Sequence, residues 1–144
     1  MTATIFLVED NPADVELFRM ALQEASLECD LVLFEDGRKF IDYVDSAQSK
    51  MALPDLLILD LNLPKNDGAE ILRVLRGLPH FASVPVAVLS SSSSSRERSK
   101  LASYQVREFI SKPSDLESYL KIGQIISSLL PPSDSRDHQN AMHT

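Results

Sequence analysis

Apolar residues follow two alternating patterns along this chain. Short apolar runs at residues 3–8, 31–34, 56–59, 86–89 and 109–110 read as strands, and those at 56–59 and 86–89 contain no polar position. A strand without polar alternation is buried on both faces, which is typical of a parallel sheet. Between the runs, apolar residues recur at helical spacing, so the pattern predicts a regular alternation of strands and helices.

The alternation of strand and helix predicts an α/β fold. Right-handed crossovers between parallel strands give an open sheet with helices on both faces. The simplest arrangement is a flavodoxin-like three-layer sandwich, with a five-stranded parallel sheet in the order 2-1-3-4-5. We expect one domain over residues 1–130, because the last helical pattern, at 116–130, stops at Pro131-Pro132. Residues 131–144 are expected to form a polar, disordered tail.

Charge and composition narrow the classes of function. The net charge is −7 and no basic stripe is present, which argues against binding to nucleic acid or to an anionic membrane surface. No apolar run reaches the ~18–20 residues of a membrane-spanning helix, and the amino terminus lacks the pattern of a signal peptide. Cys29 is the only cysteine, so the chain forms no internal disulfide, and a reducing cytoplasm fits best.

Polar residues follow the predicted strands at the points where the strands end. Glu9-Asp10 follows the first strand, Asp60 the third, Ser90 the fourth and Lys112 the fifth. Ligands bind outside the carboxyl ends of the strands in open parallel sheets, so we expect these side chains to converge on one edge.

Such a cluster has a defined chemistry. Two carboxylates ~4 Å apart repel by about 4 kcal/mol at an effective dielectric near 20, and a divalent cation would cancel that repulsion. Because the ligand set is all oxygen, Mg²⁺ is the natural choice. A carboxylate beside the cation can attack phosphorus and form an acyl phosphate, while the cation and Lys112 neutralise the transferred oxygens. Asp60 is therefore the predicted acceptor of a phosphoryl group.

Together these residues resemble the receiver domain of two-component response regulators. The resemblance covers residues 4–130 and rests on five elements in order and spacing. They are Glu9-Asp10, the run 56–60, the following Asn62, Pro64 and Gly68, Ser90 after an apolar strand, and Lys112-Pro113.

The resemblance implies a role for each residue of the site. Asp60 would accept the phosphoryl group, and Lys112 would pair with Asp60 and then with that group. Asp10 would bind Mg²⁺ together with Asp60, Glu9 would act mainly through metal-bound water, and the backbone carbonyl of Asn62 would complete the ligands.

The family also has a switch and a characteristic peptide bond. Ser90 would move to hydrogen-bond the phosphoryl oxygen, and Phe109 would turn inward when Ser90 moves. The resemblance further implies a cis peptide bond between Lys112 and Pro113, a geometry that only ~5–6% of X–Pro bonds adopt.

Two stretches, residues 7–14 and 60–65, are similar to single-domain regulators that partner phytochrome-type histidine kinases. The implied partner is a sensor histidine kinase, with the phytochrome type as the more specific expectation. Because only a short polar segment follows the receiver pattern, we expect output through the receiver itself, with a homodimer through the fourth helix, fifth strand and fifth helix as a hypothesis. Candidate contacts, which fit a buried core equally well, are Tyr104, Leu116, Tyr119 and Leu120.

Three other interpretations compete with the phosphoacceptor. A phosphohydrolase with an aspartate nucleophile usually has a second aspartate two residues later, where this chain has Asn62. An FMN-binding protein needs a phosphate loop after the first strand, where Glu9-Asp10 would repel phosphate. A receiver-shaped adaptor that is never phosphorylated stays open, although such a protein has no need to keep every site position filled.

Overall fold

The computed structural model describes residues 2–47, 53–61, 68–91 and 95–131. Helices and strands alternate there in the predicted order. The elements are β1 (Ala3–Val8), α1 (Pro12–Glu24), β2 (Cys29–Phe34), α2 (Gly37–Ala47), β3 (Leu56–Asp60), α3 (Gly68–Gly77), the 3-10 helix η1 (Pro79–Phe81), β4 (Val86–Ser90), α4 (Ser95–Ala102), β5 (Glu108–Ser111), α5 (Leu116–Leu120) and α6 (Ile122–Leu129).

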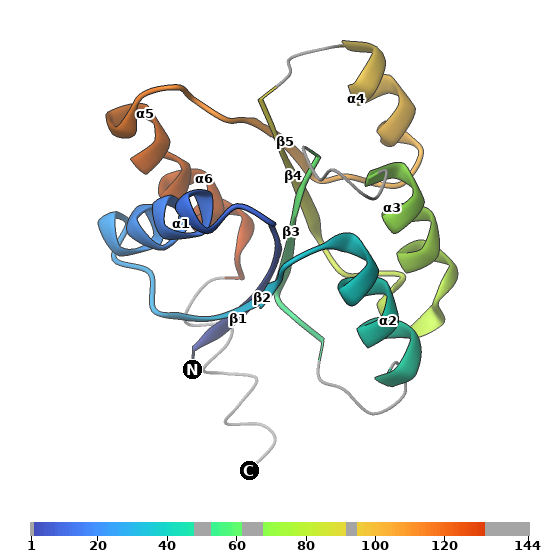
Figure 1. Ribbon diagram of the computed structural model, residues 1–144. Helices are drawn as coiled ribbons and strands as arrows, with labels where there is room; N and C mark the ends of the chain where they lie inside the picture. Colours follow the sequence, from blue (N-terminus) through green and yellow to red (C-terminus); the bar gives the residue numbers. More distant parts are fainter. Residues whose placement is uncertain (1, 48–52, 62–67, 92–94, 132–144) are drawn as a thin grey trace.

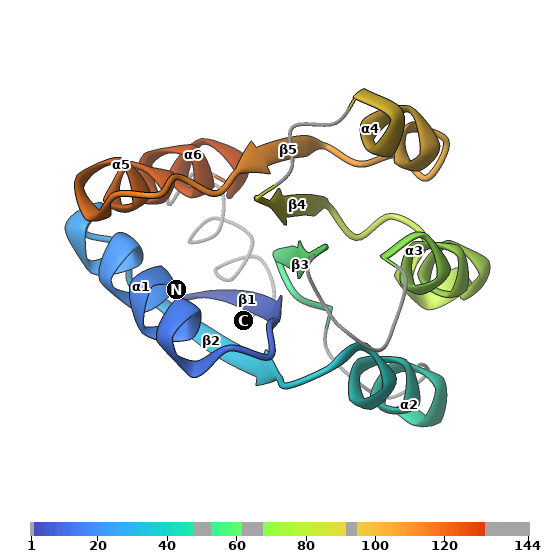
Figure 2. The same ribbon diagram turned by 45° about the horizontal axis from the view of Figure 1, so that its top comes forward.

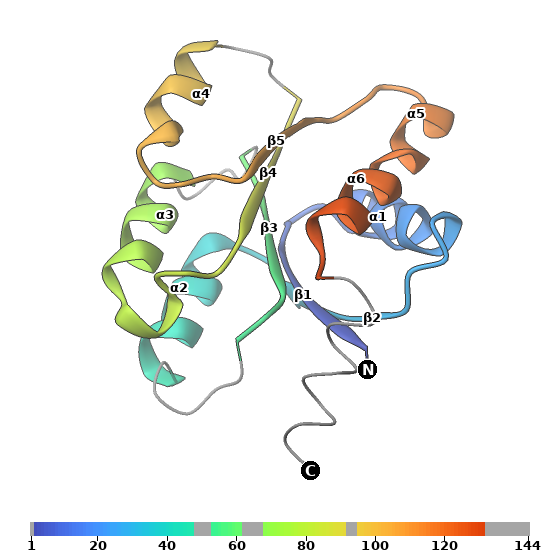
Figure 3. The same ribbon diagram turned by 180° about the vertical axis from the view of Figure 1, so that it is seen from behind.

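The strands form one parallel sheet in the order β2-β1-β3-β4-β5, which confirms the flavodoxin-like prediction. Helices α1, α5 and α6 cover one face of the sheet and α2, α3 and α4 cover the other (Figures 1 and 3). Figure 2 shows the strands in this order from β2 to β5. Topology and layers together make a three-layer sandwich.

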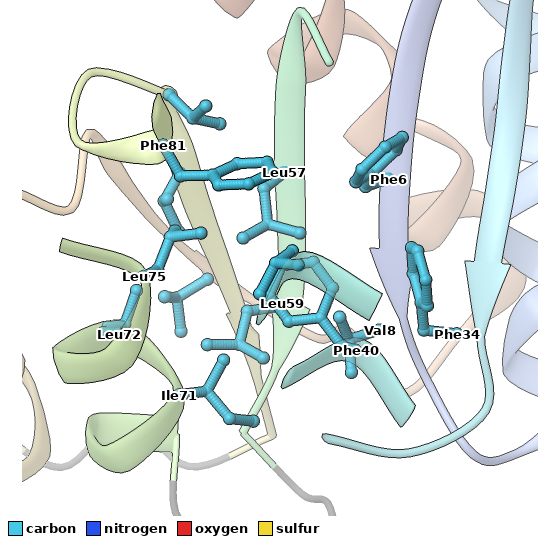
Figure 4. Packing of buried hydrophobic residues seen from close by; sticks show 14 of the residues in the cluster. Phe6, Val8, Phe34, Phe40, Leu57, Leu59, Ile71, Leu72, Leu75 and Phe81 are labelled. Atoms are coloured by element: carbon cyan, nitrogen blue, oxygen red, sulfur yellow. The ribbon is translucent and has the colours of Figure 1, made fainter. Parts of the chain in front are cut away.

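Each face of the sheet has its own hydrophobic core. Alternate residues of a strand point to opposite faces, so Leu57 and Leu59 pack toward α2 and α3 while Leu56 and Ile58 pack toward α1 and α6. Figure 4 shows the first of these cores, where the side chains of β1 and β3 meet those of α2 and α3. Strands β3 and β4 are buried along their whole length, because helices cover both of their faces.

The first helix begins as its sequence predicts. The Asn11 side chain accepts a hydrogen bond from the backbone N–H of Ala13 (2.9 Å), and Pro12 occupies the first helical position. Asp14 therefore lies in the first turn, where the helix dipole favours a negative charge. Asp14 shares a face with Phe18, four residues later, and Phe18 is fully buried, so this face turns toward the sheet.

The prediction of a single helix over residues 116–130 is wrong in one respect, because the structure has two helices there, α5 and α6, which are divided at Lys121. The backbone N–H of Lys121 donates to the carbonyl of Ser118, three residues earlier (3.2 Å), so the chain tightens locally into a 3-10 turn. Two residues later, a β-carbon at Gly123 would overlap the backbone carbonyl of Ala21. Helices α1 and α6 therefore approach closely at a point where only glycine fits.

Two predictions concern the ends of the chain and the membrane. In the described part of the chain, no helix has both the length and the apolar character that crossing a bilayer requires. The expected tail lies almost wholly outside the described residues, which end at Pro131, so its disorder stays a prediction.

Candidate functional site

The sheet positions three residues of the site at the carboxyl ends of its strands. The backbone N–H of Glu9 donates to the carbonyl of Phe34 at the end of β2 (3.0 Å), and that of Lys112 donates to the carbonyl of Ser90 at the end of β4 (2.8 Å). Asp60 is the last residue of β3, which lies between β1 and β4. The pairing of the strands therefore continues past β1 and β5 and brings these side chains to one edge, as predicted.

The Lys112 ammonium group lies among three carboxylates. Its Nζ atom is 2.7 Å from Oδ2 of Asp60, 3.1 Å from Oε1 of Glu9 and 3.1 Å from Oδ2 of Asp14. A lysine has three N–H donors, so each donor is used here. The side chains of Asp60 and Glu9 are only 1% and 2% exposed, and that of Asp14 is 27% exposed. Charges this deeply buried are stable only when they are paired and hydrogen-bonded.

The same carboxylates form a set of ligands that suits a hard cation. One carboxylate oxygen from each of Glu9, Asp14 and Asp60 lies within 4.8 Å of the others. An all-oxygen set without imidazole or thiolate favours Mg²⁺, Mn²⁺ or Ca²⁺ over softer metals. Three carboxylates face one ammonium group, so negative charge remains in excess and the residues present fit a divalent cation.

Burial of Glu9 changes its acid–base behaviour. Desolvation, together with a hydrogen bond to Asp60 and the negative charge of Asp60, raises the pKa of Glu9 from 4.5 to about 8, against the opposing effect of Lys112. Two carboxylates this close resist simultaneous ionisation, so near neutral pH the pair holds a proton. A cation at the site would favour release of that proton.

Lys112 stays protonated in spite of its burial. Desolvation alone lowers the pKa of Lys112, but the hydrogen bond to Asp60 and the charges of Asp60 and Glu9 outweigh it and raise the pKa above its ordinary value. The side chain is therefore a permanent cation at the centre of the site.

One predicted ligand is not part of the observed group, and another lies outside the described residues. Asp10 is exposed, and its backbone N–H donates to Oε2 of Glu9 (3.0 Å). The carboxylate found beside Glu9 and Asp60 belongs instead to Asp14, a residue that the sequence analysis did not single out. Asn62 lies outside the described residues. The roles of Asp10 and Asn62 as cation ligands stay predictions.

The two predicted switch residues lie on the neighbouring strands β4 and β5. Ser90 is buried at the end of β4, on the strand that pairs with β3, and Phe109 of β5 is half-buried. The guanidinium of Arg98 on α4 lies over the Phe109 ring, 5.6 Å from its centroid, a cation–π contact. A cavity of about 10 Å³ is lined by Ser90, Arg98 and Phe109, among other residues.

The expected cis bond before Pro113 is not found, because every peptide bond in the described residues is trans. Trans is the favoured isomer of an X–Pro bond. With this peptide bond trans, the ammonium group of Lys112 still contacts the three carboxylates.

The chain belongs to the response regulator receiver domain family, which it matches over residues 5–122. Response regulator Rcp1 of Synechocystis sp. is 33% identical over 128 residues, covering 86% of this chain and 86% of that protein. A segment of the sensor histidine kinase TmoS of Ectopseudomonas mendocina is 34% identical over 125 residues, which span 85% of this chain and 12% of the kinase.

Solved structures agree with this assignment. The phosphorylated cyanobacterial phytochrome response regulator RcpA superposes with a TM-score of 0.80 at 32% identity, covering 90% of this chain and 94% of that chain. The Mn²⁺-bound form of Rcp1 superposes with a TM-score of 0.77 at 29% identity, covering 90% and 99%. The chain is thus a two-component receiver domain, similar to regulators of phytochrome signalling.

The raised pKa of Glu9 predicts that metal-free protein loses stability between about pH 4.5 and pH 8. Over that range the unfolded chain releases the Glu9 proton and the folded chain keeps it, so rising pH favours unfolding by on the order of 1–3 kcal/mol. Urea unfolding in the presence of a chelator measures this slope, which Glu9→Gln should flatten. Glu28→Gln, at an exposed glutamate, is the control and should behave as wild type. Equal slopes for wild type and Glu9→Gln would refute the assignment.

Proposed function

We propose that this receiver domain is a phosphorylation switch in which Asp60 accepts a phosphoryl group from a sensor histidine kinase. The observation that carries the proposal is the 2.7 Å contact between Lys112 Nζ and a carboxylate of Asp60 that is almost completely buried. An ion pair with a purely structural role would not need the adjacent carboxylates of Glu9 and Asp14, because these repel Asp60. A signalling role, in which the chain is modified and read, fits the family better than turnover of a substrate.

The transfer uses residues already in place. A carboxylate oxygen of Asp60 attacks phosphorus, an O–P bond forms, and the bond from phosphorus to the histidine nitrogen of the kinase breaks. The electron pair of that bond goes to the nitrogen, which takes a proton. Lys112 then donates to an oxygen of the transferred group, so its positive charge follows the negative charge from Asp60 onto phosphorus.

Glu9, Asp10, Asp60 and Asn62 are the proposed ligands of Mg²⁺, and Asp14 adds a carboxylate to the set. When bound, the cation neutralises charge on the phosphoryl oxygens during transfer. The structural support is the all-oxygen donor set around Lys112. The Mn²⁺-bound form of the relative Rcp1 is consistent with a divalent cation.

Ser90 and Phe109 are proposed to report the phosphorylated state. The Ser90 hydroxyl would hydrogen-bond a phosphoryl oxygen, and Phe109 would turn into the space that Ser90 leaves. In the structure Arg98 lies over the ring, so inward rotation of Phe109 would break this cation–π contact. The state of Asp60 is thereby transmitted to α4 and β5.

The proposed upstream partner is a sensor histidine kinase of the phytochrome type, and the proposed location is the cytoplasm. The similarity to Rcp1 and RcpA supports the phytochrome type, since RcpA is a phytochrome response regulator. The net charge of −7 gives no support to a nucleic-acid partner.

Incubation with Mg²⁺ and acetyl phosphate should add the mass of one phosphoryl group to the intact protein, because a small acyl phosphate can replace the kinase as donor. Asp60→Asn should abolish the gain, since an amide is not a nucleophile toward phosphorus. Intact-mass spectrometry measures the product.

Asp42→Asn is the matched control, because Asp42 is an exposed aspartate that pairs with Arg38 on α2. It should gain mass as the wild type does. No gain in the wild type under saturating donor would establish the unphosphorylated adaptor instead.

A homodimer through α4, β5 and α5 is the proposed output. Leu116, at the start of α5, is 50% exposed and suits such a contact, whereas Tyr119 is buried and belongs to the core. Tyr104 and Leu120 are half-buried and pack against the cores of their own subunit. Of the four candidate contacts, Leu116 is therefore the strongest.

Sedimentation velocity of the phosphorylated protein should show a dimer that Leu116→Glu converts to monomer, because the substitution places a charge in an apolar contact. Leu53→Glu, at an exposed leucine before β3, should leave the dimer intact. A wild type that sediments as a monomer with and without the phosphoryl group would contradict the proposed dimer.

A further inference from the structure

The hydroxyl group of Tyr119 is buried without a hydrogen-bond partner among the residues that the structure describes. The residue is 3% exposed. Buried polar side chains are nearly always hydrogen-bonded, and burying a hydroxyl without a partner is unfavourable. A phenylalanine would fill this core position at no such cost, so the hydroxyl calls for a role in another state of the protein.

Tyr119 shares a core cluster with residues of α1, which carries Asp14, and of β5, which precedes Lys112. It belongs to the core on the α1 side of the sheet, together with Val15 of α1 and Ile110 of β5. Helix α5 packs against α1, whose first turn carries Asp14. Lys112 directly follows β5, and α5 begins only a few residues later. The hydroxyl is thus the polar end of a core side chain in the cluster that α1 and β5, the elements leading to Asp14 and Lys112, also form.

The electrostatics of the hydroxyl agree with this placement. Burial raises the pKa of Tyr119 to about 12, and the charges of Lys112, Asp14, Glu9 and Asp60 all act on it. The hydroxyl therefore keeps its proton and remains a hydrogen-bond donor at neutral pH.

Asp14 has acceptor capacity to spare. In the structure it accepts a hydrogen bond from Lys112 through Oδ2. A carboxylate has about four lone-pair positions on its two oxygens, so it can accept from a second donor. Lys112, in contrast, has no donor left, because Asp60, Glu9 and Asp14 take all three. Donation to a phosphoryl group must then rearrange these bonds.

We propose that Tyr119 is a positioning residue of the phosphoryl site, whose hydroxyl donates to Asp14 when Lys112 turns to the phosphoryl group on Asp60. The proposal rests on phosphorylation of Asp60. In the resting protein Lys112 donates to Asp14, and the hydroxyl has no hydrogen-bond partner within the described part of the chain. In the phosphorylated protein the hydroxyl replaces the ammonium group as the partner of Asp14, so this half-buried carboxylate does not lose its hydrogen bond.

This exchange favours the phosphorylated state. An interaction shifts an equilibrium only when it differs between the two states, and the Tyr119 hydrogen bond exists in one of them. Its loss should leave the resting protein unharmed and weaken the phosphorylated form. A role in packing alone predicts the same effect on both states.

The test compares Tyr119→Phe with wild type in the lifetime of the phosphoryl group after removal of acetyl phosphate, followed by intact mass. The lifetime should fall roughly two- to tenfold, the range expected for one hydrogen bond. The unfolding temperature of the unphosphorylated variant should be unchanged or higher, because an unpaired buried hydroxyl is removed. Tyr43→Phe removes the hydroxyl of an exposed tyrosine on α2 and should match the wild type in both measurements.

A double-mutant cycle tests whether Tyr119 acts through Asp14. In the Asp14→Ala background, Tyr119→Phe should no longer shorten the lifetime. A spectroscopic readout is available because the chain has three tyrosines and no tryptophan. In Tyr43→Phe/Tyr104→Phe protein only Tyr119 emits, and its fluorescence should fall on phosphorylation, since a hydrogen bond to a carboxylate quenches tyrosine.

The outcomes separate this proposal from the function on which it rests. A wild type that gains no phosphoryl group overturns both. A phosphorylated wild type whose lifetime equals that of Tyr119→Phe overturns the role of Tyr119 alone. A shorter lifetime accompanied by an equal loss of resting stability, or one that persists in the Asp14→Ala background, also overturns it.

Discussion

The interaction on which the site depends is the contact of one ammonium group with three carboxylates. Asp60 and Glu9 are buried so deeply that neither is stable as an isolated anion, and Lys112 supplies the compensating charge. The compensation is incomplete, because one cation faces three acids. Burial of Glu9, together with the hydrogen bond to Asp60 and its charge, raises the pKa of Glu9, so the Glu9–Asp60 pair retains a proton. A site with excess negative charge and a centrally placed lysine can receive a divalent cation and then a phosphoryl group. The chemistry of the receiver thus follows from an imbalance of charge that the fold maintains.

The apolar packing of the sheet stabilises the fold against this excess of negative charge. Strands β3 and β4 are anchored by apolar side chains on both faces, so the fold can hold unfavourable charges at their ends without coming apart. The same pairing that places Lys112 beside Ser90 also places Phe109 beside β4, with Arg98 over its ring. Neighbouring strands thus connect the end of β3, where Asp60 lies, with β5 and α4.

Much of this arrangement could be predicted from the sequence, because strand order and strand ends follow from apolar runs and parallel topology. The convergence of Glu9, Asp60 and Lys112 needed no side-chain detail. Asp14 was missed because it lies within a helix, although its spacing of four from the buried Phe18 was a signal that it points inward. Periodicity does not encode the close approach of α1 and α6 at Gly123, nor that the Tyr119 hydroxyl finds no hydrogen-bond partner among the described residues.

The central claim is that Lys112 is the counter-ion of the three carboxylates and neutralises the same negative charge that a bound divalent cation would neutralise. Calorimetric titration of Mg²⁺ into wild type and Lys112→Met measures this most directly. Removal of one positive charge from beside three carboxylates should tighten Mg²⁺ binding by about tenfold or more, because Lys112 no longer repels the cation. Two unit charges ~4 Å apart interact by up to about 4 kcal/mol at an effective dielectric of 20. Binding that is equal or weaker in Lys112→Met would contradict the account.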